Sequence, residues 1–278
     1  MIVIRITGGL GNQMFQYSLY KVLKKKGKEV KADLSTFYQS KIHNGYELNK
    51  VFGIDVDIAN YEDIYKYIDP KMDAVSRRNS YFYEENDYFL YHSWIFDTDN
   101  IFLDGYWQSE KYFKDIREEI IEDFTSNIKL DNKNIDMLQK IIDCNSVSLH
   151  IRRGDYINHP LLGGITTVEY YNNAINEIKK RVDNPRFIVF SNDTDWVKEN
   201  LFIEDSEIVD WNTGEDSFKD MILMSKCKHN IIANSTFSWW GAWLNENEDK
   251  LVIAPNKWLN GYYTPDIWCE DWITVNID

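Results

Sequence analysis

The hydrophobic positions near the start of the chain follow a strand, loop and helix pattern. Residues 3–6 form a short β-branched run that ends at a cluster of glycines, and residues 13–26 then place apolar side chains about one helical turn apart. Residues 29–34 return to a strand-like pattern. We therefore predict a strand, a glycine loop, a helix and a second strand. Residues 61–104 are rich in aromatic and acidic residues without a clear period, and no element is predicted there.

The alternation becomes regular after residue 146. Short apolar runs predict strands at residues 147–151, 187–190, 207–209, 231–233 and 251–254. The stretches between them predict helices at residues 168–182, 195–201, 215–226 and 237–244. Strands that alternate with helices predict a mostly parallel sheet covered on both faces.

Two further helices are expected before this regular part, at residues 115–124 and 134–144. The apolar face of the second is predicted to comprise Ile135, Leu138, Ile141 and Ile142. Because both halves of the chain begin with an α/β unit, we expect two α/β domains, residues 1–145 and 146–278.

The composition is that of an ordinary globular protein. Of the 278 residues, 44% are hydrophobic and 27% are charged, which excludes disorder, collagen-like repeats and a coiled coil. The net charge of −14 argues against a general binder of nucleic acid or of anionic membranes, because such a protein would have to overcome its own field. Any phosphate that the protein holds must therefore be bound by a local group of donors.

The sparse cysteines suit a reduced compartment. Cys144, Cys227 and Cys269 lie far apart and without the spacing of a zinc site. No stretch approaches the ~18 apolar residues of a membrane span, and the first residues lack the basic region and apolar run of a signal peptide. We expect a cytoplasmic protein without a transmembrane segment.

Two adjacent arginines follow the predicted strand at residues 147–151. Arg152 and Arg153 lie where open parallel sheets place their ligands. Guanidinium groups match phosphate oxygens bidentately and can hold the charge of a departing diphosphate, so a diphosphate clamp is one interpretation. A structural ion cluster with Asp155 is the alternative.

A hydroxyl-rich loop follows the predicted strand at residues 231–233. Ser235 and Thr236 open the next predicted helix, where they can act as plain N-caps. Helix N-termini also direct hydroxyl and backbone N–H groups at anions. Two such loops at the ends of neighbouring strands, one with the arginines and one with the hydroxyls, would form a site of nucleotide size, and this coincidence favours function.

The glycine cluster near the start gives a weaker signal. Gly9 and Gly11 are followed by Met14 where a dinucleotide fingerprint needs a third glycine, and no phosphate-binding Gly-Lys-Ser/Thr follows. The turn either lets the backbone approach a ligand or is only a tight turn.

An acidic side chain precedes the hydroxyl-rich loop. Asp220 could pair with guanine, which offers a carboxylate two parallel donors, although a solvated helical aspartate is the simpler interpretation. Asp-x-Asp triplets at residues 55–57, 97–99 and 193–195 are expected by chance among 45 acidic residues, and five scattered histidines lack ligand spacing. We therefore expect no metal.

Five segments of the chain resemble one known family. Residues 8–17, 103–113, 150–156, 190–193 and 234–243 look like the α-1,2-fucosyltransferases of glycosyltransferase family 11. The segments match in order and cover nearly the whole chain.

This resemblance implies an α/β fold of the GT-B type, with two Rossmann-type domains that face a cleft. GDP-fucose would be held mainly by the C-terminal domain and a galactoside acceptor largely by the N-terminal one, without a metal. Arg152 would be the principal diphosphate clamp and Arg153 its support. The implied donor-binding set is Arg152, Arg153, Asn192, Asp220, Ser235, Thr236, Phe237 and Ser238, together with Gly9, Gly11, Asn12 and Gln13 of the glycine turn.

The resemblance also implies an inverting displacement, in which the 2-hydroxyl of a galactose attacks fucose as GDP departs. Arg152 would stabilise the charge that develops on the diphosphate. A general base is expected, with Asp155 as first candidate and His150 as second. The alternatives are a fucosyltransferase of another linkage or acceptor, and a non-catalytic protein that binds a GDP-sugar or a glycan. A lipid-linked acceptor would require peripheral contact with a membrane, and no nucleic-acid partner is expected.

Overall fold

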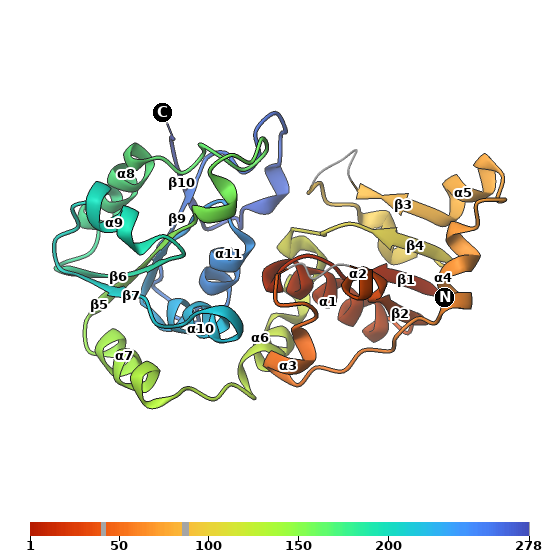
Figure 1. Cartoon of the computed structure of the whole chain (residues 1–278), viewed down its shortest axis with the longest axis horizontal. Coiled ribbons are helices and arrows are strands. Elements are labelled where there is room, and N and C mark those ends of the chain that lie inside the picture. The colour runs from red at the N-terminus through yellow and green to blue at the C-terminus, as the bar shows by residue number, and fades with distance from the viewer. Residues whose placement is uncertain (40–42, 85–88, 278) are drawn as a thin grey trace. The chain divides into compact units, whose positions relative to one another are not determined.

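The computed structural model describes residues 1–39, 43–84 and 89–277 (Figure 1). Its contacts divide the chain into two compact units. Unit 1 consists of Met1–Ile128 with Pro265–Ile267, and unit 2 consists of Lys129–Thr264 with Trp268–Asp278. Each unit is an α/β structure with its own sheet.

Unit 1 contains a four-stranded parallel sheet of order β2-β1-β4-β3. Its strands are β1 (Ile2–Arg5), β2 (Val30–Asp33), β3 (Tyr81–Tyr83) and β4 (Ile101–Asp104). Its α-helices are α1 (Leu10–Lys25), α2 (Ser35–Gln39), α3 (Leu48–Phe52), α4 (Tyr61–Ile68), α5 (Ala74–Ser80) and α6 (Arg117–Thr125). The predicted strand, loop, helix and strand at the start are confirmed.

The short elements between residues 61 and 104 were not predictable from hydrophobic period. Strand β3 has three residues and strand β4 has four, and all residues of β4 are buried. A fully buried short strand shows no alternation of polar and apolar positions. Tyr67 of α4 packs with Val3 and Phe102 on the sheet, so the aromatic residues of this region form part of the core.

Unit 2 contains a six-stranded parallel sheet of order β10-β9-β8-β5-β6-β7. Its strands are β5 (Asn145–Ile151), β6 (Pro185–Ser191), β7 (Ser206–Val209), β8 (His229–Ile231), β9 (Val252–Pro255) and β10 (Ile273–Val275). Its α-helices are α7 (Asn132–Ile142), α8 (Val168–Lys179), α9 (Thr194–Asn200), α10 (Phe218–Lys226) and α11 (Thr236–Trp243). The predicted parallel sheet is confirmed, with β10 as an additional edge strand.

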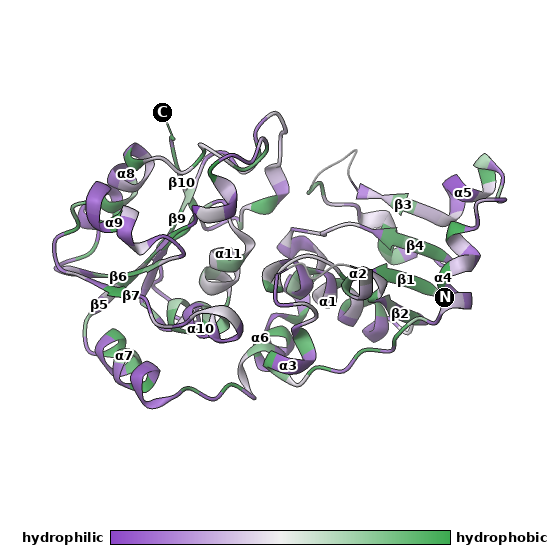
Figure 2. Ribbon diagram, in the orientation of Figure 1, coloured by the Kyte–Doolittle hydropathy of each residue, from purple (hydrophilic) through white to green (hydrophobic). Residues whose placement is uncertain are grey.

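The central strands bury both of their faces. In β5, Val147 and Leu149 pack with α8, whereas Ile188 and Phe190 of the neighbouring strand β6 pack with α7 and α10 on the opposite face. Figure 1 shows α8 and α9 on one side of this sheet and α10 and α11 on the other. Figure 2 shows how the hydrophobic residues concentrate along the strands, while α9 carries hydrophilic residues. This layered arrangement holds the carboxyl ends of the strands in fixed register.

The predicted apolar face of the helix at residues 134–144 was wrong. Asn134, Met137 and Ile141 are the buried residues of α7, whereas Ile135 and Ile142 are exposed. The polar Asn134 can be buried because it exchanges hydrogen bonds with Asn212, an arrangement that a hydrophobic pattern does not reveal.

The boundary between the units lies before α7. Helix α7 packs against β5 and α10, so it belongs to unit 2 although it precedes residue 146. No helix in the described part of the chain is long and apolar enough to cross a membrane.

Candidate functional site

The order of strands in unit 2 creates a topological switch point between β5 and β8. The chain continues from β5 to β6 and β7 on one side and then returns to β8 on the other side of β5. Ligands of open parallel sheets bind at the carboxyl ends of the strands beside such a point. Arg152 and Arg153 follow β5, and Asn234 and Ser235 follow β8 closely, so the two predicted loops do end neighbouring strands.

Arg152 is partly buried and paired with an exposed carboxylate. Its Nη2 lies 3.0 Å from Oδ2 and 2.9 Å from Oδ1 of Asp155. Its guanidinium carbon lies 5.4 Å from the ring centroid of Tyr156. Its Nε is buried and finds no hydrogen-bond partner among the described residues. The guanidinium is therefore held in place while one of its donors is unused.

Arg153 is tied to the loop after β6. Its backbone N–H donates to Oδ1 of Asn192 at 2.9 Å, and its Nε donates to Oδ2 of Asp193 at 3.1 Å. Its guanidinium stacks 3.9 Å from the ring centroid of Trp196 on α9. These contacts bring the predicted residues Arg153 and Asn192 together and give Arg153 a bracing position.

The loop after β8 uses part of its polar side chains internally. The Ser238 hydroxyl accepts from the backbone N–H of Ala233 at 3.2 Å and donates to the Ser235 carbonyl at 3.3 Å. Ser235 is the N-cap of α11 but makes no side-chain cap bond. Thr236 and Phe237 are half-buried at the start of the helix. Ser238 thus shapes the loop from within.

His150 links the two loops. Its ring lies 5.8 Å from the ring of Phe237, and the side chain is buried. Burial, together with the nearby charge of Arg152, lowers the pKa of His150 to about 3, so the imidazole is neutral near pH 7. Its Nδ1 has no hydrogen-bond partner within the described part of the chain.

Asp220 lies in the first turn of α10, the helix that packs against α11. Oδ1 of Asp220 accepts from Nδ2 of Asn212 at 2.7 Å. Burial raises the pKa of Asp220 to about 7, and the hydrogen bond from Asn212 only partly opposes this. Asn212 also bonds Asn134 of α7 and was not identified from the sequence, where an asparagine in a loop gives no signal.

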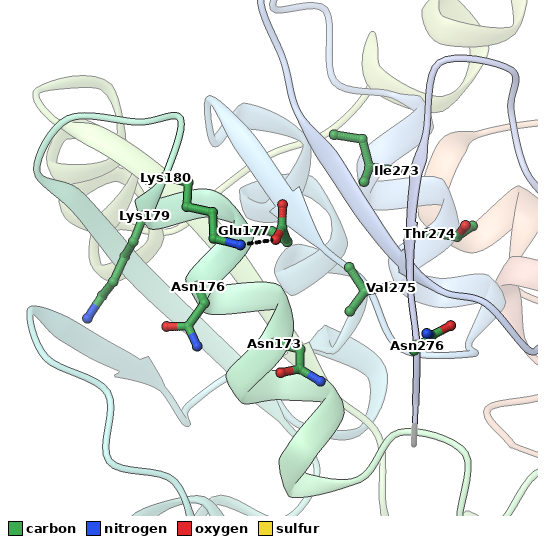
Figure 3. Close-up of a pocket in the computed structure, with 9 residues that line it drawn as sticks. All are labelled: Asn173, Asn176, Glu177, Lys179, Lys180, Ile273, Thr274, Val275 and Asn276. Carbon is green, nitrogen blue, oxygen red and sulfur yellow. Dashed lines mark hydrogen bonds and ion pairs between the residues drawn. The ribbon is translucent and has the colours of Figure 1, made fainter.

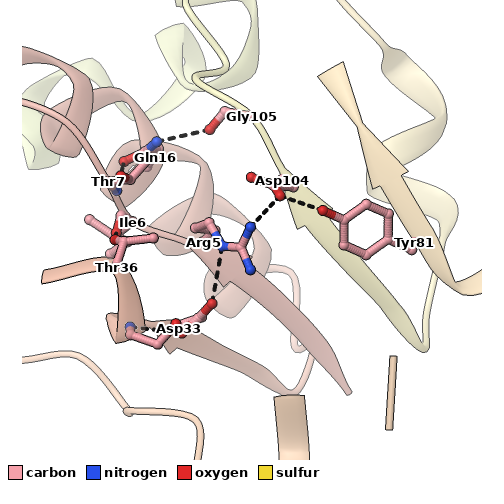
Figure 4. A network of polar contacts seen from close by, with 10 residues as sticks. Arg5, Ile6, Thr7, Gln16, Asp33, Thr36, Tyr81, Asp104 and Gly105 are labelled. Carbon is pink, nitrogen blue, oxygen red and sulfur yellow. Dashed lines mark hydrogen bonds and ion pairs between the residues drawn. The ribbon is translucent and has the colours of Figure 1, made fainter. Parts of the chain in front are cut away.

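Unit 1 has a matching switch point between β1 and β4. Gln16 of α1 joins the loops that follow these strands, because its Oε1 accepts from the Thr7 N–H at 2.9 Å and its Nε2 donates to the Gly105 carbonyl at 2.8 Å (Figure 4). Nε2 of Gln108 donates to Oδ1 of Asn12 at 2.9 Å, which adds a second connection between the same loops.

The glycine turn is held from within unit 1. Gly8, with a φ of 79°, takes the left-handed conformation, whereas Gly9 caps α1 and Gly11 lies inside the helix. Gln13 is completely buried, and its Nε2 donates to the carbonyls of Gly8 at 2.9 Å and Gly45 at 2.8 Å. Its Oε1 accepts from the Glu47 N–H at 2.9 Å. The Gln13 side chain is therefore engaged in holding the turn.

Charged residues fix the strand ends of unit 1 (Figure 4). Arg5 lies between Asp33 and Asp104, with contacts of 3.1 Å and 2.5 Å, and Tyr81 also contacts Asp104. Burial raises the pKa of Glu84 to about 7, while its carboxylate accepts from the backbone N–H groups that follow Gly105. These contacts hold the ends of β1, β2 and β4 rigidly.

The residues described include no group of three or more histidine, cysteine, aspartate or glutamate side chains arranged to hold a metal ion. A surface hollow of about 620 Å³ lies between α8 and β10 (Figure 3). It is lined by Asn173, Asn176, Glu177, Lys179, Lys180 and residues 273–276. None of the predicted site residues lines it.

Two Rossmann-type units of this kind define a GT-B-like fold. The structure is similar to that of the fucosyltransferase NodZ from Bradyrhizobium, with a TM-score of 0.51 and 14% identity over 86% of this chain and 90% of that one. At this identity the similarity supports the fold alone.

The sequence defines the family. The model of glycosyl transferase family 11 matches residues 1–276, and the chain belongs to this family of glycosyltransferases. An alpha-1,2-colitosyltransferase of Escherichia coli is 35% identical over 99% of both chains. A galactoside alpha-(1,2)-fucosyltransferase 2 of Hylobates lar is 27% identical over 91% of this chain and 71% of its own. The resemblance found in the five sequence segments is thus confirmed.

Proposed function

We propose that this glycosyltransferase transfers L-fucose from GDP-fucose to the 2-hydroxyl of a galactose-containing acceptor, with inversion and without a metal. The observation that best supports the proposal is Arg152 at the switch point of unit 2. A buried Nε–H without a partner is costly, and an anionic oxygen of a diphosphate would satisfy it.

The pairing of Arg152 with Asp155 is compatible with ligand binding. Asp155 is half exposed, and exposed ion pairs contribute only about 0–1 kcal/mol. A diphosphate can therefore replace Asp155 on the guanidinium at small cost. Arg153 would support the clamp from its fixed position on Asp193 and Trp196.

The remaining donor contacts are proposed on the loop after β8 and on α10. Ser235 and Thr236 would donate to phosphate oxygens at the start of α11, and Phe237 would contact the nucleoside. Asp220 would select guanine, because an ionised carboxylate can accept the two parallel N–H groups of that base. Asn192 and Ser238 would act through the backbone that they hold.

Asp155 is the proposed general base. When the diphosphate occupies Arg152, the Asp155 carboxylate is released from its ion pair and becomes available to accept the proton of the acceptor hydroxyl. His150 is less suited, because its lowered pKa makes the imidazole a weak base. As fucose leaves the diphosphate, negative charge grows on the bridging oxygen, and Arg152 stabilises it.

A second candidate differs only in the transferred sugar. The relative that is 35% identical is an alpha-1,2-colitosyltransferase, and colitose is fucose without its 3-hydroxyl. A GDP-linked colitose would offer the same diphosphate and base to unit 2. The acceptor is proposed to bind unit 1 near the glycine turn, with Asn12 and Gln108 as its polar contacts.

The test is transfer from a panel of nucleotide sugars to β-galactosides in the presence of a chelator. GDP-fucose should give a product that is α-1,2-linked by NMR, with GDP released only when the acceptor is present. Preference for GDP-colitose would support the second candidate. Binding of GDP-sugar without transfer to any acceptor would contradict an enzymatic function.

A further inference from the structure

Three buried polar atoms gather at the ends of β5 and β8. Nε of Arg152, Nδ1 of His150 and Oδ1 of Asn234 have no hydrogen-bond partner among the described residues. Buried polar groups are nearly always paired in native proteins, so such a group calls for a ligand or a water. The first atom is explained by a diphosphate, but Asn234 has no part in the proposed function.

The orientation of the Asn234 amide is fixed by its partners. The side chain belongs to a residue that is 1% exposed, and its Nδ2 donates to the carbonyls of Leu162 at 3.1 Å and Trp258 at 3.2 Å. Only the amide nitrogen can donate to two carbonyls. The remaining Oδ1 is therefore an acceptor that needs a donor.

The two carbonyls come from loops that border the switch point. Leu162 follows β5 and the turn at Gly154–Tyr156, and Trp258 follows β9. Asn260 joins the same loops, because its N–H donates to the Leu161 carbonyl at 2.8 Å and its Nδ2 donates to the Gly163 carbonyl at 2.9 Å. Asn234 thus sits in a braced frame, which keeps its oxygen in place.

We propose that Oδ1 of Asn234 accepts a hydrogen bond from a hydroxyl group of the bound nucleotide sugar. This inference rests on the proposed function, since it places the donor at the end of β5 and β8. The chemistry separates the two neighbouring positions. Arg152 offers donors and attracts anionic oxygens, whereas a carbonyl oxygen repels them and prefers O–H. The hydroxyl belongs either to the ribose or to the transferred hexose.

The test measures the coupling between Asn234 and each ligand hydroxyl. Affinities of the full-length protein and of Asn234→Ala are compared for GDP-fucose and for analogues that lack one ribose or fucose hydroxyl, colitose being the 3-deoxy member. In the wild type we expect one analogue to bind roughly threefold to tenfold more weakly, and in Asn234→Ala this difference should disappear. A coupled ribose analogue identifies the nucleoside as the source, and a coupled fucose analogue identifies the hexose.

Asn260→Ala is the matched control, because it loosens the same loops without removing the unpaired oxygen. It should keep the full discrimination between the parent and the deoxy ligand. If wild-type protein binds GDP-fucose and all deoxy analogues equally, the inference is wrong even if Asn234→Ala does not fold. Failure of the wild type to bind any GDP-linked ligand would instead overturn the proposed function.

Discussion

The adjacent arginines differ in how strongly the protein holds them. Arg153 is fixed by Asn192, Asp193 and the ring of Trp196, whereas Arg152 contacts the half-exposed Asp155 and keeps its Nε unused. A side chain that is already saturated can orient a neighbour but has little to offer a ligand. We therefore assign the diphosphate to Arg152 in the proposed reaction.

Replacing Arg152 should abolish most of the transfer. Arg152→Ala removes a donor aimed at developing charge, so kcat/KM is expected to fall by an amount equivalent to roughly 2.7–4 kcal/mol. The melting temperature should change little, because only an exposed ion pair is lost. The measurement is the rate of GDP release with a galactoside acceptor. Arg186→Ala, which breaks a similar pair with Glu207, is the control and should keep full activity.

Asp220 should make GDP binding dependent on pH. The pKa of this carboxyl is about 7 without ligand, and pairing with guanine stabilises only the ionised form. Binding therefore requires loss of a proton below pH 7, and the affinity for GDP should rise as the pH increases from 6 to 8. Calorimetry with ADP as the reference separates this effect from titration of the phosphates.

Asp220→Asn tests the assignment from the other side. An amide does not ionise and cannot accept both N–H groups through two oxygens, so the preference for GDP over ADP and its pH dependence should both be lost. Retention of the guanine preference in this variant would show that another group reads the base.

At the scale of elements, long hydrophobic patterns were predictable and short buried ones were not. The strands β5 and β6 and the helix α8 were expected near their observed positions because each has a clear apolar run or face. Strand β3 has only three residues, and edge strand β10 also has three, which is too short for a recognisable period. The face of α7 was mispredicted because the buried Asn134 is stabilised by polar partners distant in sequence.

The position of the candidate site followed from the order of elements. Loops that end predicted parallel strands could be identified, which placed Arg152 and Ser235 near the same sheet edge. The partners of these residues could not, because the bond from Arg153 to Asn192 and the ties from Asn234 to Leu162 depend on register and loop geometry. The low pKa of His150 likewise follows from its burial in the folded chain.

The turn after β5 should be sensitive to a single methyl group. Gly154 has a φ of 30°, and a Cβ there would lie 2.4 Å from Nδ2 of Asn192. Gly154→Ala should therefore displace Asn192, break its bond to Arg153 and weaken GDP binding. Gly164→Ala is the control: its φ is 70°, but nothing lies within 4 Å of the added Cβ.

Both glycine variants should lose about 1–2 kcal/mol of unfolding free energy from the left-handed backbone. Only Gly154→Ala should lose GDP affinity as well. Denaturant unfolding and calorimetry measure the two effects separately, and equal GDP affinities in the two variants would contradict the role given to the turn.

At the scale of the whole molecule, each unit offers its own switch point. The protein carries a net charge of −14, so an anionic donor must be bound by local donors such as those around Arg152. Unit 1 instead presents neutral amides, Asn12 and Gln108, beside its glycine turn. This contrast supports the proposed division between donor and acceptor.

Hydrogen exchange with mass spectrometry tests that division. GDP should slow exchange in residues 150–156, 190–193 and 234–240, with little effect on residues 8–17 and 103–113. Addition of a galactoside acceptor should extend the protection to the latter segments. Protection by GDP confined to unit 1 would reverse the proposed roles of the two units.

A crystal structure with GDP bound measures the central claim directly. We predict that an oxygen of the diphosphate lies within hydrogen-bond distance of the Arg152 guanidinium, with Asp155 displaced from it. GDP bound elsewhere, with the pair between Arg152 and Asp155 intact, would contradict the account.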